Sequence, residues 1–120
     1  MQLLGTEFGP SLDGKILFLE TYRLQKRHIH ALLTQLRIRG AFGAIGGLVL
    51  GYCLGSDAVG TGNERDLGEI VAEVTEGLGF PVIQVGEIGH QVENLILPLG
   101  VRARISTEPV VFDLLEPAVV

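Results

Sequence analysis

Apolar positions along the chain form short continuous runs and longer helical stripes. Residues 16–19 are a continuous apolar run, which predicts a short strand in the core. The next apolar positions recur at intervals of three and four residues and predict one face of a helix, formed by Ile29, Leu32, Leu33 and Leu36. Gly40 predicts the end of that helix, because glycine readily adopts the backbone conformation that terminates helices.

The same order of elements then repeats. Residues 47–52 predict a second strand and residues 82–85 a third, since both runs are short, apolar and bounded by turn residues. Between them lies a second helical stripe, made of Leu67, Ile70, Val71, Val74 and Leu78. Gly77, Gly79 and Pro81 predict its end.

The start of the second helix is predicted from cap residues. Residues 55–62 form a loop of small residues, and the spacing of Thr61 and Glu64 is that of a capping box. Asn63 is the rival N-cap, because its side chain can also accept a backbone hydrogen bond.

The C-terminal part predicts a hairpin-like tail. Val101, Ala103 and Ile105 alternate with arginines, which predicts a half-buried strand. Residues 109–115 predict a final edge strand, because Pro109 cannot donate to a ladder. We therefore expect a single α/β domain over residues 1–120, with two main helices on a small mixed sheet.

Composition narrows the class of protein. The 120 residues are 47% apolar and 19% charged, which is typical of a globular domain. A net charge of −5 gives no electrostatic case for binding nucleic acid or an anionic membrane. The longest uncharged run, residues 41–56, is shorter than the ~18 residues of a spanning helix. With one cysteine, Cys53, and no visible signal peptide, we expect a cytoplasmic protein without a disulfide.

Two strand ends carry the candidate chemistry. His90 lies in a glycine-punctuated turn that follows the third strand, and Glu20 follows the first. Glycine-rich turns at strand ends are where α/β proteins present reactive side chains. A histidine and a carboxylate at two such ends are a candidate catalytic pair. The alternative is a loop histidine that only hydrogen-bonds its neighbours.

For several other residues, both a functional and a purely structural role are possible. His28, His30 and His90 lack the spacing of metal ligands, so we expect no metal. The glycine-rich runs 43–51 and 55–62 lack the Gly-Lys-Ser/Thr ending of a P-loop, and we expect no cofactor. Arg102 and Arg104 form either an anion-binding face or a solvated one. Glu87 and Glu93 either tune His90 or contact substrate, or are solvated loop carboxylates, which is the simpler interpretation. Cys53 is either a nucleophile or, more simply, a buried small residue.

Several spaced blocks together resemble one known family. The chain is similar to the C-terminal domain of the LD-carboxypeptidases, a family that includes the microcin C7 immunity peptidases. The blocks that carry the resemblance are Gly5-Thr6, residues 12–20, residues 33–36, residues 80–82, Gly89-His90 with Asn94, residues 97–100 and the tail 115–119. The resemblance covers essentially the whole chain and implies a small swivelling β/β/α domain.

The resemblance also implies a mechanism. Family members are serine peptidases with a Ser–His–Glu triad, so Glu20 corresponds to the triad carboxylate and His90 to the general base. The nucleophilic serine and the oxyanion hole belong to an N-terminal domain that this chain is too short to hold. None of its serines, at positions 11, 56 and 106, lies in a Gly-x-Ser-x-Gly elbow. We therefore expect half of a peptidase, inactive alone, which pairs with a nucleophile domain and forms a homo-oligomer.

One segment departs from the family pattern. Many members show Pro-Tyr-Arg-Ile-Asp where this chain has residues 26–30, and only Ile29 matches. The substrate therefore stays open between a muropeptide and a microcin-like peptidyl nucleotide. The alternative from a different class is a non-catalytic α/β domain that binds a ligand or mediates assembly. The distance between Glu20 and His90 separates these two classes.

Overall fold

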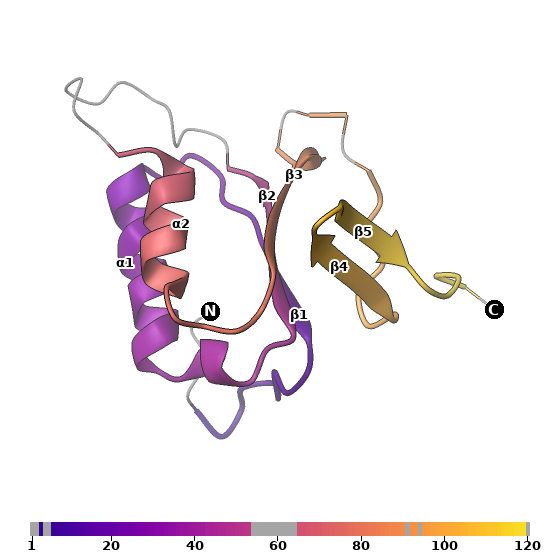
Figure 1. Cartoon of the computed structure of the whole chain (residues 1–120), viewed down its shortest axis with the longest axis horizontal. Helices are drawn as coiled ribbons and strands as arrows, with labels where there is room; N and C mark the ends of the chain where they lie inside the picture. The colour runs from indigo at the N-terminus through magenta and orange to yellow at the C-terminus, as the bar shows by residue number, and fades with distance from the viewer. Residues whose placement is uncertain (1–2, 4–5, 54–64, 91, 94, 120) are drawn as a thin grey trace.

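The computed structural model describes residues 3, 6–53, 65–90, 92–93 and 95–119. A parallel sheet has the strand order β1-β2-β3, with β1 at Ile16–Leu19, β2 at Gly47–Tyr52 and β3 at Val82–Gly89. Two helices, α1 at Lys26–Ile38 and α2 at Leu67–Thr75, lie side by side against one face of this sheet (Figure 1). A short 3-10 helix, η1 at Ala41–Gly43, leads from α1 to β2.

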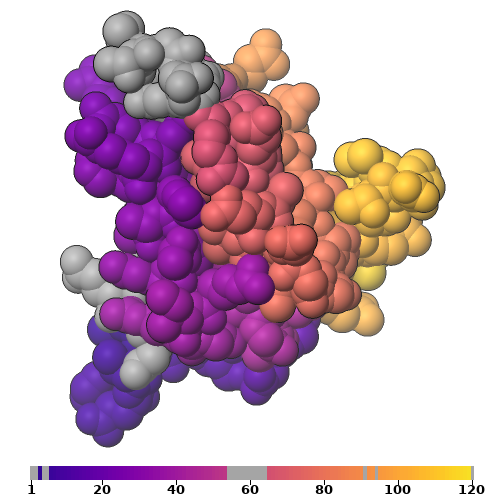
Figure 2. Space-filling view, turned by 60° about the vertical axis from the view of Figure 1, so that its left-hand side comes forward, coloured from indigo at the N-terminus to yellow at the C-terminus, as the bar shows by residue number. Residues whose placement is uncertain are grey.

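The C-terminal strands form a second, separate sheet. β4 at Ala103–Thr107 pairs antiparallel with β5 at Val110–Leu114. This hairpin lies on the side of the parallel sheet that is opposite the helices (Figure 1). The C-terminal end of the chain projects from the body of the molecule (Figure 2). The predicted α/β class, with two helices and both parallel and antiparallel strands, is confirmed, and the two kinds of pairing lie in different sheets.

Alternation along the strands explains this layered arrangement. Side chains of successive strand residues point to opposite faces. Leu48 and Leu50 of β2 pack in one core cluster with residues of both helices. The helix residues in this cluster are Ile29, Leu33 and Leu36 of α1 and Ile70, Val71 and Val74 of α2. Val49, between the two leucines, is fully buried on the face toward the hairpin and lines a cavity of about 410 Å³ there. β2 is therefore buried on both faces, as a central parallel strand should be.

The hairpin is anchored on the sheet at a glycine. A Cβ atom on Gly47 would overlap Cδ1 of Ile105, so the Ile105 side chain occupies the space that Gly47 leaves empty. β3 and β4 are also in contact. Removal of apolar surface from water at this contact favours docking of the hairpin.

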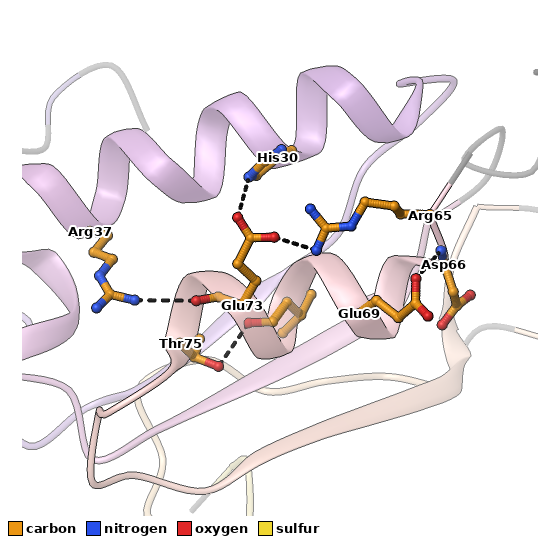
Figure 3. A network of polar contacts seen from close by, with 8 residues as sticks. His30, Arg37, Arg65, Asp66, Glu69, Glu73 and Thr75 are labelled. Atoms are coloured by element: carbon orange, nitrogen blue, oxygen red, sulfur yellow. Dashed lines mark hydrogen bonds and ion pairs between the residues drawn. The ribbon is translucent and has the colours of Figure 1, made fainter. Parts of the chain in front are cut away.

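Polar side chains tie the two helices together (Figure 3). The Arg37 guanidinium donates hydrogen bonds to the carbonyl oxygens of Glu73, Val74 and Glu76, at 3.3, 2.7 and 3.1 Å. These carbonyls lie at the C-terminal end of α2, where helix carbonyls run out of intrahelical donors, and the Glu73 carbonyl also accepts from the Glu76 N–H at 3.3 Å. The Glu73 carboxylate also contacts Arg65 and lies 3.7 Å from Nε2 of His30. α1 therefore stabilises the end of α2 directly.

The start of α2 differs from the sequence expectation. The start of α2 was expected at the Thr61–Glu64 box or at Asn63; these residues lie outside the described ranges, and α2 begins at Leu67 with Asp66 as N-cap. Asp66 and Glu69 form the capping box, because the Asp66 carboxylate accepts from the Gly68 N–H and the Glu69 carboxylate accepts from the Asp66 N–H. The predicted N-cap was therefore wrong.

The third strand is longer than the sequence indicated. It was expected over residues 82–85, whereas β3 continues to Gly89 and its pairing with β2 is irregular. Leu78, expected on the second helix, lies beyond the end of α2 but still packs against the core. Within the described ranges, no helix is long and apolar enough to cross a membrane.

Candidate active site

The site lies at the edge of the sheet where the three parallel strands end. β1 and β3 flank β2 and run in the same direction, so their carboxyl ends meet at one edge. Glu20 directly follows β1 and His90 directly follows β3. In open α/β sheets, this edge is the usual location of a ligand site. The topology therefore brings the two predicted residues together from 70 positions apart.

The Glu20 carboxylate and the His90 imidazole are within hydrogen-bond distance. Oε1 of Glu20 lies 2.7 Å from Nδ1 of His90 and 3.4 Å from the backbone nitrogen of the same residue. An ionised carboxylate only accepts hydrogen bonds, so Nδ1 is the protonated nitrogen in the neutral ring. Nε2 then keeps its lone pair and can accept a proton from a third group.

The two side chains differ in their exposure to solvent. The Glu20 side chain is 19% exposed, whereas the His90 side chain is 51% exposed. The carboxylate is therefore more shielded from solvent than the ring, and the imidazole is reachable by another molecule or domain. This is the arrangement of an orienting carboxylate and an accessible base.

Glycine in the middle strand makes room for the pair. Gly51 lies near the end of β2, and a Cβ atom there would lie only 2.7 Å from the carbonyl oxygen of Ile88 and 2.8 Å from Cζ of Phe18. Without that atom, the ends of β1 and β3 can approach each other across β2. The final residue of β3, Gly89, has a φ of +144°, a conformation that L-residues with side chains rarely adopt.

The irregular pairing of β3 sets where His90 emerges. Leu50 pairs with Gln84, but Tyr52, two residues later on β2, pairs with Gly89, five residues later on β3. The additional β3 residues are accommodated by a bulge, a distortion that often re-aims side chains next to active sites. The Leu95 N–H donates to the Glu87 carbonyl oxygen, so the chain after His90 folds back along β3.

Tyr22 is a site residue that the sequence reasoning missed. Its ring centroid lies 4.5 Å from that of His90, with the two ring planes inclined at 32°. The signal available in the sequence was its position two residues after Glu20, on the same segment that leaves β1. That signal was weak, because the conformation of this segment is not regular.

The other predicted candidates lie away from this pair. The Ser11 hydroxyl donates to Asp13, and the Ser106 hydroxyl accepts from the Glu108 N–H within the hairpin. Ser56 lies outside the described ranges. Cys53 is buried, with its sulfur 3.6 Å from the Gly51 carbonyl oxygen. In the described part of the chain, no three residues of the metal-binding types gather closely enough to hold an ion.

The hairpin arginines are engaged with acidic partners. Arg102 donates to Glu116 from its backbone nitrogen and from Nε, each at 2.8 Å, and Arg104 pairs with Asp113. The side-chain and backbone hydrogen bonds from Arg102 lower the pKa of the Glu116 carboxyl below its ordinary value of 4.5. These exposed pairs support the interpretation of a solvated face.

The segment that departs from the family pattern forms the start of α1. Residues 26–30 are its first five residues, and Gln25, the N-cap, makes no side-chain capping hydrogen bond. The first turn contains no acidic residue, although acidic residues there would complement the helix dipole.

Comparisons with known proteins are consistent with one another. A sequence model of the LD-carboxypeptidase C-terminal domain matches residues 1–105. The microcin C7 self-immunity protein MccF of Escherichia coli is 32% identical over 102 residues, which cover 84% of this chain and 29% of that protein.

Solved structures give the same result. MccF in complex with aspartyl sulfamoyl adenosine matches with a TM-score of 0.83 at 27% identity, over 98% of this chain and 35% of that chain. A muramoyltetrapeptide carboxypeptidase from Oxalobacter formigenes matches with a TM-score of 0.73 at 27% identity, over 85% of this chain and 36% of that chain. This chain thus spans about a third of the length of the proteins that it matches.

Proposed function

The chain belongs to the LD-carboxypeptidase C-terminal domain family, and from that membership we propose that it supplies the Glu20 carboxylate and the His90 imidazole of a Ser–His–Glu triad. The triad hydrolyses an amide bond in a peptide substrate. The observation that carries the proposal is the 2.7 Å contact between Oε1 of Glu20 and Nδ1 of His90, formed by two strand ends at one sheet edge.

The geometry suits the proton transfers of acyl transfer. With Nδ1–H held by Glu20, Nε2 of His90 accepts the proton of a serine hydroxyl as that oxygen attacks the carbonyl carbon. The imidazolium then returns the proton to the leaving amine. Glu20 stabilises the imidazolium through the same hydrogen bond, and it fixes which nitrogen carries the proton beforehand.

The nucleophile comes from a different domain. Ser11 and Ser106 hydrogen-bond within their own turns, so neither described serine is engaged with His90. The matched relatives are about three times as long as this chain, which leaves room in them for a further domain. We propose that such a domain provides the serine and the oxyanion donors, and that residues 1–120 alone do not hydrolyse the substrate. The 51% exposure of the His90 side chain supports this, because the base is open to an approaching group.

The substrate follows from the relatives at the level of class. One relative is a muramoyltetrapeptide carboxypeptidase, and another is a microcin immunity protein whose structure contains aspartyl sulfamoyl adenosine. For this chain we propose the terminal amide bond of a muropeptide tetrapeptide as the first substrate to test. An aminoacyl sulfamoyl nucleoside, which resembles a peptidyl nucleotide, is the second.

A domain exchange tests the proposal. This chain replaces the C-terminal third of the Oxalobacter formigenes enzyme, and release of D-alanine from a tetrapeptide is compared among variants. His90→Gln and Glu20→Gln should each lower kcat by about a thousandfold or more. His28→Gln is the matched control, because His28 is an exposed histidine on α1. The 120-residue chain alone should release no D-alanine.

Either of two results would contradict the proposal. Hydrolysis that survives His90→Gln removes His90 from the mechanism. A folded exchange protein that cleaves neither substrate favours instead a domain that binds a ligand or mediates assembly.

A further inference from the structure

The Tyr22 ring packs against the imidazole of the proposed base. The centroids of the Tyr22 and His90 rings lie 4.5 Å apart, within the range of favourable aromatic contacts. Tyr22 is 44% exposed and lies outside the core cluster, so burial in the core does not explain where its ring sits. We propose that Tyr22 is a positioning residue that holds the plane of the His90 ring. This inference rests on the proposed function, because it assigns Tyr22 a role in the same triad.

The hydrogen bond to Glu20 leaves one freedom of the His90 ring open. Rotation about the bond that joins the ring to Cβ has a broad energy profile in histidine. Glu20 restrains the ring at a single atom, Nδ1, and half of the His90 side chain is exposed to solvent. A second contact, on the face of the ring, would limit this rotation. It would keep Nδ1 hydrogen-bonded to Glu20 and leave Nε2 free to accept a proton. Tyr22 supplies such a face contact.

The backbone beside Tyr22 fits this role. Arg23 has a φ of +53°, in the left-handed region that residues with side chains seldom adopt. Conformations of this kind cluster at functional sites, where surrounding contacts hold them in place. Here the Arg23 guanidinium lies over the Tyr22 ring, with its central carbon 5.1 Å from the ring centroid. A cation over an aromatic face is attracted to it, so Arg23 helps to hold the Tyr22 ring.

Residues 20–23 thus contribute three interactions around the His90 ring. Glu20 orients His90 through a hydrogen bond, Tyr22 restrains the ring through its face, and Arg23 supports Tyr22. All three come from the segment that connects β1 to α1. The segment after β1 accordingly sets the tautomer and the ring orientation of His90, which follows β3.

The test measures the tautomer of His90 in the ¹⁵N-labelled 120-residue chain by two-bond ¹H–¹⁵N correlation, at a pH where the ring is neutral. The wild-type protein and Tyr22→Phe should both hold the proton on Nδ1. Tyr22→Leu should shift the ratio of tautomers toward Nε2–H by about threefold to tenfold, which corresponds to the loss of an aromatic contact. Phe8→Leu, at an exposed aromatic residue elsewhere, is the matched control and should leave the ratio unchanged.

Two results would overturn the inference. One is a Tyr22→Leu variant that is folded and shows the same His90 tautomer ratio as the wild-type protein. The other is the absence of a nuclear Overhauser effect between the Tyr22 and His90 rings in the wild-type protein, which needs no variant to fold. Neither measurement uses a substrate or a nucleophile domain, so failure of this inference is distinct from failure of the proposed function, which appears only in the hydrolysis assay. In that assay, Tyr22→Leu should lower kcat by about threefold to tenfold at an unchanged KM, whereas Tyr22→Phe should keep the wild-type kcat.

Discussion

The Cβ atom of Glu20 lies 3.3 Å from the position that a Cβ atom on Gly51 would occupy. The two residues belong to the ends of neighbouring strands, and the missing side chain on β2 is what lets the Glu20 carboxylate reach His90 from β1. The candidate site therefore depends on a residue that contributes no chemical group to it.

Gly51→Ala should disturb this site and the fold together. The added methyl group meets the Ile88 carbonyl oxygen at 2.7 Å, and backbone cannot yield as a flexible side chain can. We expect the free energy of unfolding, measured by urea denaturation, to fall by about 1–3 kcal/mol, as for overpacked cores. Gly79→Ala is the control, because no atom lies within 4 Å of its added Cβ. Equal stability of the two variants would show that the strand ends do not need the glycine.

Arg37→Met should loosen the contact between the helices. It keeps most of the aliphatic side chain but removes the three hydrogen bonds to the carbonyls that end α2. We expect a loss of about 1–2 kcal/mol in the free energy of unfolding, since the Val74 and Glu76 carbonyls lose the donor that Arg37 supplies, whereas the Glu73 carbonyl keeps the Glu76 N–H. Arg27→Met removes the same charge from an exposed position of α1 and serves as the reference. A loss of the same size in both variants would assign the effect to charge rather than to the carbonyls.

Ile105→Ala should weaken the docking of the hairpin on the parallel sheet. The Ile105 side chain occupies the space above Gly47, so its truncation leaves a void between the two sheets. Because Ile105 is only half-buried, we expect a loss of about 1–3 kcal/mol, in the lower part of the range for such truncations. Val110→Ala, at a residue that is 71% exposed in the same hairpin, should change stability by less than about 0.5 kcal/mol.

The Arg102–Glu116 contact predicts a dependence of stability on acid pH. Arg102 lowers the pKa of Glu116 in the folded chain below the ordinary value of 4.5. The folded state therefore binds this proton less readily, so the contribution to stability is present above pH 4.5 and is lost as the pH falls through the folded-state pKa. In urea titrations, Glu116→Gln should reduce the loss of stability in that window. Glu7→Gln removes an exposed carboxylate elsewhere, and an identical pH profile for the two variants would contradict the assignment.

The ends of strands and the apolar faces of helices could be predicted from the sequence, because buried positions are marked by apolar residues. The apolar run of β1 ends at Glu20, and the position of His90 beyond a second parallel strand predicts that both lie at one edge. The catalytic role of this pair stays a proposal. Tyr22 could not be placed, because it lies in the segment between β1 and α1, where no apolar periodicity fixes the direction of a side chain.

Competing local signals account for the boundaries that were wrong. Both the Thr61–Glu64 spacing and the Asp66–Glu69 spacing satisfy the capping-box pattern. The second sits immediately before Leu67 and Ile70, which are buried, so packing selects it. β3 was predicted too short because Gly86 and Gly89 suggest a turn, whereas the structure uses them within an irregular strand.

The strand order also governs when the Glu20–His90 contact can exist during folding. β1 reaches β2 only after the chain has passed through α1, and β2 reaches β3 only after α2. Contacts between residues so distant in sequence require the entropy of two long loop closures to be overcome first, and they form slowly compared with local hairpins. The β4–β5 hairpin, by contrast, needs only one tight turn. The hydrogen bond between Glu20 and His90 accordingly requires both crossovers to be closed, so it reports on the assembled parallel sheet and not on either strand pair alone.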